Sequence, residues 1–268
     1  MFANARMYST SPLVTQAWHD VFAWVAATAG VELEVIDYPP PQPLSALWAR
    51  ADMGCAFMCG YPYALSPRRP VILAAPVPNP EAYRGTPVYW TDIVVRADSR
   101  LRELSDVYGK RFAYTSEDSQ SGYQSVRTLF APYAQERGGR LFAETVGPLM
   151  TPRRVIDAVL DGTADAGPVD SYVMELVRAH EPQVAAGLRT LASTRPIPIP
   201  PLVAAHGIDR EIAERLRYAL LGVGDAPALA VACSDLSLLG FVAVSPSRYD
   251  LLAASARAAD AQSYPRLA

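Results

Sequence analysis

The sequence predicts an α/β protein of two doubly wound lobes joined by a two-strand hinge. Apolar residues at strand spacing alternate with apolar residues at helical spacing through most of the 268 residues. Repeated βα units of this kind are typical of doubly wound, parallel sheets. The tail beyond residue 208 shows helical spacing and little strand pattern, so its helices need a sheet that lies elsewhere in the chain.

The first ninety residues carry one βα series. Ser11-Pro12 is a typical helix start, and the run YPPPQP interrupts regular structure after the second strand. We expect strands at 2–7, 31–37 and 53–58, helices at 12–29 and 43–50, then the apolar run 70–77 and a long strand at 87–97.

A second series runs from about residue 110 to residue 192. Thr151 and Pro152 mark one helix start, and Asp161-Gly162 marks the end of that helix. We expect strands at 111–115, 140–146, 164–169 and 188–193, and helices at 121–131, 152–161 and 171–180.

The domain boundaries follow from the tail. The run STRPIPIPP is too rich in proline for regular structure, and three helices are expected within 208–263. If these helices cover the first sheet, the chain crosses between the lobes near 91–97 and near 192–200. The first lobe is then 1–91 with 197–268, and the second is 92–196.

Composition and charge exclude several classes of partner. The net charge is −3, half of the residues are apolar, and Lys and Arg are scattered, so we expect no nucleic-acid partner. No apolar run reaches the roughly 18 residues of a membrane span, so we expect no direct membrane insertion. The N-terminus lacks the basic and apolar regions of a secretory signal. We expect either a cytoplasmic protein or one whose signal was removed.

The three cysteines are expected to be reduced core thiols without a metal. Cys55 and Cys59 lie in an apolar run, and four residues along a strand place them roughly 13 Å apart, too far for a disulfide. Neither these cysteines nor Cys233 have histidines at metal-ligand spacing. We expect no metal and no cofactor.

Motifs for catalysis are missing from the sequence. It contains no phosphate-binding loop of the G-x-x-x-x-G-K-[ST] type, no H-E-x-x-H pair and no G-x-S-x-G nucleophile motif. The three histidines stand in ordinary contexts, and no carboxylate pair is singled out for acid–base work. We therefore assign no catalytic residues and expect a protein that is not an enzyme.

The stretch TSEDSQSGYQSVRTLF is the main candidate for binding. A strand leads into Ser119, Gln120, Ser121 and Gly122, and a helix follows. A helix start presents unpaired N–H groups and the positive end of the helix dipole, which favour an anion. Gly122 would let the backbone approach a tetrahedral oxyanion. Alternatively, Ser121-x-x-Gln124 fits a capping box, and the hydroxyls serve only as caps.

Further polar and aromatic residues are expected at the carboxyl ends of strands or in the crossing strand. In open α/β sheets ligands bind beyond these strand ends. Instead of binding a ligand, each tyrosine could be an ordinary half-buried aromatic residue, and the aspartate could be a helix N-cap. The residues are Tyr61, Tyr89, Thr91 and Asp170.

Four segments together resemble the substrate-binding proteins of phosphate and phosphonate ABC transporters, which have the type II periplasmic-binding-protein fold. The segments are VYWTDIVVRADS, YGKRFAYTSEDSQSGY, DGTADAGPVDSYV and STRPIPIPPLVA. The resemblance covers roughly residues 50–245, and its most specific part is the Ser-x-Ser-Gly-Tyr element.

The resemblance implies a small anionic ligand held between two closing lobes, without chemistry, and a transporter permease as the partner if the protein is exported. It assigns the grip on the ligand oxygens to Ser119, Gln120 and Ser121, and it matches Tyr61, Tyr89, Thr91 and Asp170 to family positions. It also implies a periplasmic location. Where the family commonly has a Ser-His pair, this chain has Met150-Thr151-Pro152, so a carboxylate or sulfonate is an alternative ligand. An enzyme or a cytoplasmic sensor on the same fold is the alternative function.

Overall fold

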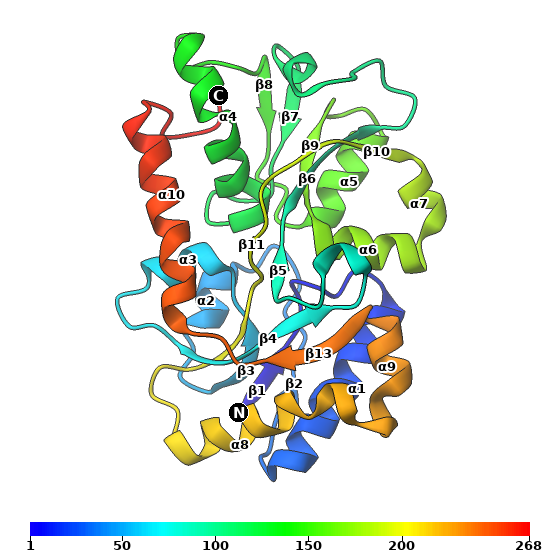
Figure 1. The fold of residues 1–268 in the computed structure, drawn as a ribbon, viewed down its shortest axis with the longest axis vertical. Coiled ribbons are helices and arrows are strands. Elements are labelled where there is room, and N and C mark those ends of the chain that lie inside the picture. The colour runs from blue at the N-terminus through cyan, green and yellow to red at the C-terminus, as the bar shows by residue number, and fades with distance from the viewer. The chain divides into compact units, whose positions relative to one another are not determined.

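The computed structural model describes residues Met1–Ala268 and divides them into two compact units (Figure 1). Unit 1 contains Met1–Val88 and Pro198–Tyr249, and unit 2 contains Tyr89–Ile197 and Asp250–Ala268. Each unit has β-sheet of its own with helices packed on it, so the predicted α/β class is confirmed.

Unit 1 is built on a six-stranded sheet of mixed direction. Its order is β13-β4-β12-β3-β1-β2. β1 runs parallel to β2 and β3, whereas β12 and β13 run antiparallel to their neighbours. The parallel sheet expected from the sequence is therefore wrong for this unit. β12 is antiparallel to both of its neighbours, and an antiparallel strand needs no crossover helix. The strands are Phe2–Asn4, Glu34–Val35, Met53–Phe57, Val71–Pro78, Leu202–Ala204 and Leu238–Val242 for β1, β2, β3, β4, β12 and β13.

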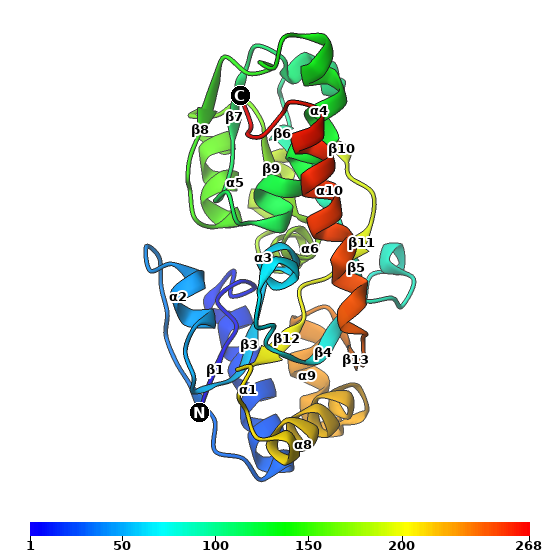
Figure 2. The same cartoon turned by 90° about the vertical axis from the view of Figure 1, so that its left-hand side faces the viewer.

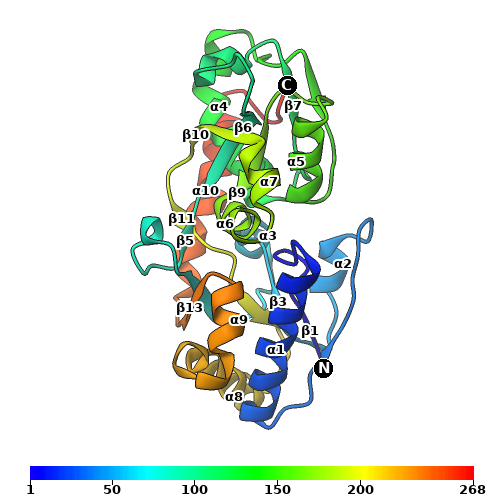
Figure 3. The same cartoon turned by 90° about the vertical axis from the view of Figure 1, so that its right-hand side faces the viewer.

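The helices of unit 1 include two from the C-terminal tail. Ser11 Oγ accepts from Val14 N–H and caps α1, which ends at Gly30 in the left-handed region (φ 59°). Figure 3 shows α8 and α9 beside α1, and all three pack together. Trp18 on α1 meets Phe57 of the sheet edge-on, with ring centroids 5.0 Å apart. The helices are α1 Pro12–Ala29, α2 Leu44–Trp48, α3 Gly60–Leu65, α8 Arg210–Leu221 and α9 Ala230–Asp235.

Unit 2 contains two small sheets. β6 lies between β10 and β9 and is antiparallel to both, and β7 pairs in parallel with β8. Phe112 on β7 bridges to Ala166, which links the two sheets. The strands are β6 Thr91–Arg96, β7 Arg111–Ala113, β8 Glu144–Val146, β9 Gly167–Asp170 and β10 Leu188–Ser193, and the helices are α4 Ser125–Glu136, α5 Pro152–Leu160, α6 Ser171–His180 and α7 Pro182–Ala186.

The core of unit 2 is aromatic. Phe112 stacks on Phe142 at 4.5 Å between ring centroids, and Phe130 of α4 meets both rings edge-on. Leu267 and Tyr264, near the C-terminus, are buried in the same cluster. The end of the chain is therefore part of this core.

The chain passes between the units three times rather than twice. The two passages near the expected positions lie within β5 (Val88–Tyr89) and β11 (Ile197–Pro198), which pair with each other. The third, between Tyr249 and Asp250, was not predicted, and it places α10 (Asp250–Ala261) in unit 2. The expected first lobe is thus wrong beyond residue 249.

The physical reason is the packing of α10 on α4. The two helices lie side by side in Figures 1 and 2. Small buried residues on α10, among them Ala253, Ala256 and Ala259, allow this close contact. The tail also supplies a strand that the sequence reading missed, β13, at the edge of the sheet of unit 1.

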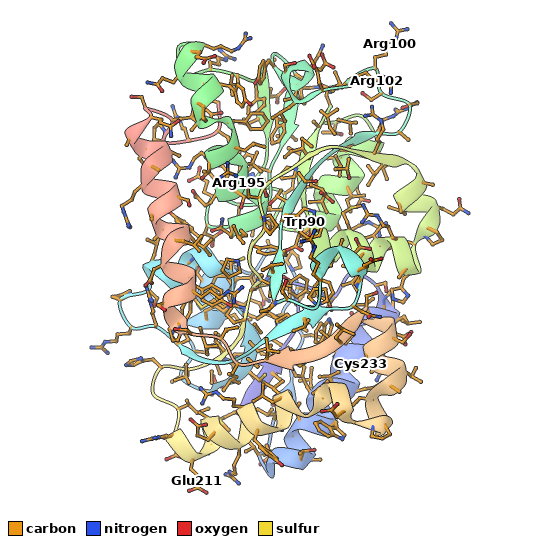
Figure 4. All side chains as sticks on the ribbon, in the orientation of Figure 1. Trp90, Arg100, Arg102, Arg195, Glu211 and Cys233 are labelled. Atoms are coloured by element: carbon orange, nitrogen blue, oxygen red, sulfur yellow. The ribbon has the colours of Figure 1, made fainter.

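Two of the three cysteines lie in the core, as the sequence predicts. Cys55 and Cys59 are buried, Cys233 on α9 is half-buried (Figure 4), and none of the three forms a disulfide. Burial raises the pKa of the Cys55 thiol. No single helix is long and apolar enough to span a bilayer, although the bent pair Arg210–Asp225 and Pro227–Asp235 meets the length and composition requirement together.

Candidate functional site

The Ser-rich stretch forms the start of a long helix in unit 2. A π-helical turn, η3 (Gln120–Gln124), continues directly into α4. Ser119 is the N-cap, and its Oγ accepts from Gly122 N–H (3.0 Å). The capping box expected at Ser121 and Gln124 is wrong, because Gln124 Nε2 donates instead to the carbonyl of Glu117 (2.6 Å).

The helix start leaves several donors unused. The backbone N–H groups of Gln120, Ser121 and Tyr123 make no hydrogen bond to any residue outside η3, and the hydroxyl of Ser121 makes none. Ser119 Oγ accepts from the backbone but keeps its own proton available for donation. N–H groups at this end also carry the positive end of the helix dipole. These groups are suited to hold an anion.

Two buried polar atoms at the same place have no hydrogen-bond partner. They are Thr115 Oγ1, at the end of the strand region, and Gln120 Oε1 on the first residue of η3. Both residues are only 3% exposed, and the other end of the Gln120 amide donates to Ser125 Oγ (2.9 Å). Leaving a buried polar atom unpaired costs about 1–3 kcal/mol. Such atoms beside free helix donors indicate a place where a polar ligand completes the hydrogen bonding.

Gly122 has a packing role that the sequence reading did not foresee. A Cβ atom at this position would stand 1.9 Å from Thr115 Oγ1 and 2.8 Å from Thr115 Cγ2. The Gly122 carbonyl also accepts from Thr115 N–H (3.3 Å). A side chain is therefore excluded by Thr115 even before any ligand is considered.

Thr91 and Asp170 support the helix start from the neighbouring strands. They are register partners on β6 and β9, and both are buried. Thr91 Oγ1 donates to the carbonyl of Ser121 (3.0 Å), so its proton is committed to holding η3. Asp170 Oδ1 accepts from Tyr172 N–H (2.9 Å) and Val173 N–H (3.3 Å) and caps α6.

The two tyrosines lie in different environments. Tyr89 is fully buried in β5, two residues before Thr91. Tyr61 is half-buried on the short helix α3 and belongs to unit 1. Unit 2 therefore holds every predicted site residue except Tyr61.

The acidic residues near the helix start do not occupy its donors. Asp118 accepts from Ser116 Oγ (2.6 Å), and the side chain of Glu117 is exposed. The pKa of Tyr123 is raised chiefly by burial, with a further contribution from the charge of Glu117. The two carboxylates are thus turned to other partners or to solvent.

Four further residues lie around the helix start, and sequence reasoning did not single out two of them, Thr115 and Arg127. Thr194 Oγ1 accepts from Thr91 N–H (3.0 Å), and Thr115 packs on Gly122. Gln124 and Arg127 form a buried hydrogen-bond pair on the inner side of the helix. Nothing in the sequence separates Arg127 from the arginines that face solvent.

Unit 2 also contains a hollow of about 390 Å³. It lies beside Arg96, the last residue of β6, and Arg111, the first residue of β7. Two of its four basic residues form ion pairs, Arg96 with Asp98 and Arg111 with Asp165, and the other two are Arg100 and Lys110. Arg100 and Arg102, in the loop beyond β6, extend into solvent (Figure 4). This hollow is a weaker candidate than the helix start, because carboxylates already balance its paired arginines.

Comparison with known proteins decides the family. The sequence model described as an ABC transporter phosphonate periplasmic substrate-binding protein matches residues 8–249. The chain belongs to this family. Its members are substrate-binding components of transporters, so the expected absence of a catalytic role agrees with the family, and the enzyme alternative is not favoured.

Solved structures show the same fold. A binding protein component of an ABC phosphonate transporter from Pseudomonas aeruginosa has a TM-score of 0.78 at 17% identity, over 98% of this chain and 87% of that one. PhnD1 from Prochlorococcus marinus, in complex with methylphosphonate, has a TM-score of 0.76 at 15% identity, over 97% and 98%. A third, from Xanthomonas citri and bound to ATP, has a TM-score of 0.67 at 18% identity, over 98% of each chain. The type II periplasmic-binding-protein fold inferred from the sequence is thereby confirmed.

Proposed function

We propose that this family member captures a small phosphonate at the start of η3, as the substrate-binding component of an ABC transporter. The oxyanion accepts from the N–H groups of Gln120, Ser121 and Tyr123 and from the Ser121 hydroxyl. Ser119 contributes its remaining proton, while Gly122 and Thr91 fix the backbone. Tyr61, Tyr89 and Asp170 remain proposed ligand contacts from the family pattern.

The observation that carries the proposal is the set of unpaired donors beside buried, unpartnered polar atoms. The free N–H groups and hydroxyl lie at the positive end of a helix, and Thr115 Oγ1 and Gln120 Oε1 lie beside them without partners. A tetrahedral oxyanion offers several acceptor lone pairs to such a helix start. A phosphonate that retains one proton also offers a donor to the buried amide oxygen of Gln120.

The family suggests a cellular location and a partner for the protein. Its description is that of a periplasmic component of a transporter. We propose a periplasmic location and a membrane permease as the partner that receives the ligand. The methylphosphonate bound to the relative from Prochlorococcus marinus supports the choice of a small alkylphosphonate as the first ligand to test.

Calorimetric titration with a matched set of anions tests the proposal. Methylphosphonate, inorganic phosphate, methanesulfonate and acetate differ in charge and in the number of oxygens but are similar in size. We expect methylphosphonate and phosphate to bind more tightly than methanesulfonate and acetate, because only the phosphorus oxyanions combine at least three oxygens with a proton that titrates near neutral pH. Tighter binding of acetate or methanesulfonate would contradict the phosphonate assignment, and binding of none of the four would reject the helix start as an oxyanion site.

A further inference from the structure

The side chain of Arg127 is buried at the back of the proposed site and has all of its donors engaged. It is 3% exposed, and its five N–H donors make five hydrogen bonds. Nε and Nη2 donate to Gln124 Oε1 at 3.1 and 2.9 Å. Arg127 therefore has no donor left for a ligand, and any effect on binding must pass through its partners.

The other partners of Arg127 all belong to the C-terminal segment. Nη1 donates to the carboxylate of Asp260 and to the carbonyl of Tyr264 (3.0 Å), and Nη2 donates to the carbonyl of Ala256 (3.0 Å). A second connection comes from Leu267, whose N–H donates to the hydroxyl of Tyr123 in η3 (3.1 Å). The segment Asp250–Ala268 thus contacts the helix start at two independent points.

Gln124 carries this contact forward to the loop that precedes the site. Its Oε1 accepts both bonds from Arg127, while its Nε2 donates to the carbonyl of Glu117 (2.6 Å). Glu117 stands two residues before the N-cap Ser119. A continuous set of hydrogen bonds therefore runs from α10 through Arg127 and Gln124 to the loop that orients the free donors.

We propose that the C-terminal segment Asp250–Ala268 is a brace for the ligand-binding turn, and that Arg127 and Gln124 are its positioning residues. The proposal rests on the proposed function, because the turn matters only if it holds the ligand. Without the brace, the segment Glu117–Gln124 samples other conformations, and the N–H groups no longer converge on one oxyanion. The apparent affinity is then the intrinsic affinity multiplied by the fraction of molecules in the binding-competent conformation.

Three substitutions separate positioning from general stability. Arg127→Met keeps the buried volume but removes all five bonds. Gln124→Glu keeps an oxygen acceptor for Arg127 but replaces the donor to Glu117 by a charged carboxylate oxygen, so α10 stays attached while the loop is released. Because this added charge itself repels an anion, hydrogen exchange is the deciding readout for this variant. Arg111→Met is the matched control, because it breaks an ion pair with Asp165 in the same unit. Arg111 is the first residue of β7, whereas the proposed site follows the last residue of that strand.

The readouts are methylphosphonate affinity by calorimetry, amide hydrogen exchange of Glu117–Gln124 in the free protein, and the melting temperature. We expect both Arg127→Met and Gln124→Glu to weaken binding by roughly tenfold or more and to speed exchange of this segment by a similar factor. Gln124→Glu should do so with a melting temperature close to that of the parent. Arg111→Met should lower the melting temperature and leave affinity and local exchange unchanged.

Two results would overturn the brace. One is unchanged exchange of Glu117–Gln124 in both variants, and the other is faster exchange with unchanged affinity. If the parent binds no phosphonate, the proposed function fails, and the brace is then judged on exchange alone.

Discussion

The hydroxyls at the start of η3 have different tasks although they stand two residues apart. Ser119 Oγ caps the helix through Gly122 N–H, whereas the Ser121 hydroxyl makes no hydrogen bond within the chain. We therefore propose that Ser119 Oγ both caps the helix and donates to the ligand, whereas the Ser121 hydroxyl serves the ligand alone. Replacing Ser119 by alanine should cost about 1 kcal/mol of folding free energy, a loss that thermal melts would detect and that is not expected for Ser121→Ala.

Gly122→Ala should destabilise unit 2. The new Cβ would meet Thr115 Oγ1 at 1.9 Å, and Thr115 is buried and cannot move away. Overpacking of this kind costs about 1–3 kcal/mol. Urea unfolding should show the loss, and the double variant with Thr115→Ala should recover much of it. Gly207→Ala is the control, because nothing lies within 4 Å of its added Cβ; equal losses at both glycines would refute the clash.

Asp92→Asn should change how stability depends on pH. Burial raises the pKa of Asp92, although Ser193 Oγ donates to its carboxylate (2.6 Å) and Arg178 lies 4.0 Å away. A carboxyl with a raised pKa in the folded state contributes stability below its unfolded pKa of about 3.9, and that contribution is lost as the pH rises through the folded value. The asparagine variant should gain stability relative to the parent between about pH 4 and pH 7.

Asp98→Asn is the control for that pH experiment, because the sign reverses. Hydrogen bonding by Arg96 lowers the pKa of Asp98, so its contribution is present at neutral pH and is lost in acid. Urea unfolding at both pH values should therefore give relative shifts of opposite sign for the two variants. Shifts of the same sign would contradict the burial argument for Asp92.

Residue patterns singled out the stretch that we propose as the site, but they did not predict the hydrogen-bond partners of its residues. Ser119 to Gly122 stand out in sequence because short hydroxyl residues and glycine cluster before a helical pattern. Thr91 looked like a ligand contact, but its proton is used by the Ser121 carbonyl, a bond between segments 30 residues apart. Such long-range partners are set by the strand order and are not encoded in local spacing.

At the scale of elements, α10 shows where sequence periodicity stops being informative. Its buried face consists of Leu252 and three alanines, and alanine suits several packing partners equally well. Arg127 of α4 donates hydrogen bonds to Asp260 and to two carbonyls of the tail, which hold α10 on α4. The helical pattern of the sequence does not predict these bonds. Helices with capped starts, such as α1 after Ser11-Pro12, were by contrast predicted at their observed first residue.

Leu267→Ala tests the placement of the tail in unit 2. Leu267 is buried in the aromatic core of that unit, and its loss should cost about 2–5 kcal/mol. Hydrogen exchange should rise in β7 and α4 and stay unchanged in β3 and α1 of unit 1. Leu251→Ala is the control, since Leu251 is an exposed residue of α10. Faster exchange confined to unit 1 would contradict the assignment.

At the scale of the whole molecule, the fold class followed from alternating strand and helix patterns, and the family followed from short motifs spread over the chain. Family matching over residues 8–249 and structural likeness at 15–18% identity agree with that reading. The sheet directions and the third chain passage could not be predicted, because both depend on how the chain returns between units. A net charge of −3 gives no overall attraction for an anion, so the proposed affinity for one must arise locally.

The most direct test of this account is the affinity of methylphosphonate for the parent, for Ser121→Ala and for Ser116→Ala, measured by calorimetry beside thermal melts. Ser116 lies in the same loop, but its hydroxyl is bound to Asp118. A hydrogen bond to a charged group contributes about 1.5–3 kcal/mol, so Ser121→Ala should weaken binding roughly ten- to a hundredfold. Its melting temperature and the affinity of Ser116→Ala should stay near the parent values. Unchanged affinity in Ser121→Ala, with the parent binding methylphosphonate, would contradict the assignment of the ligand to this helix start.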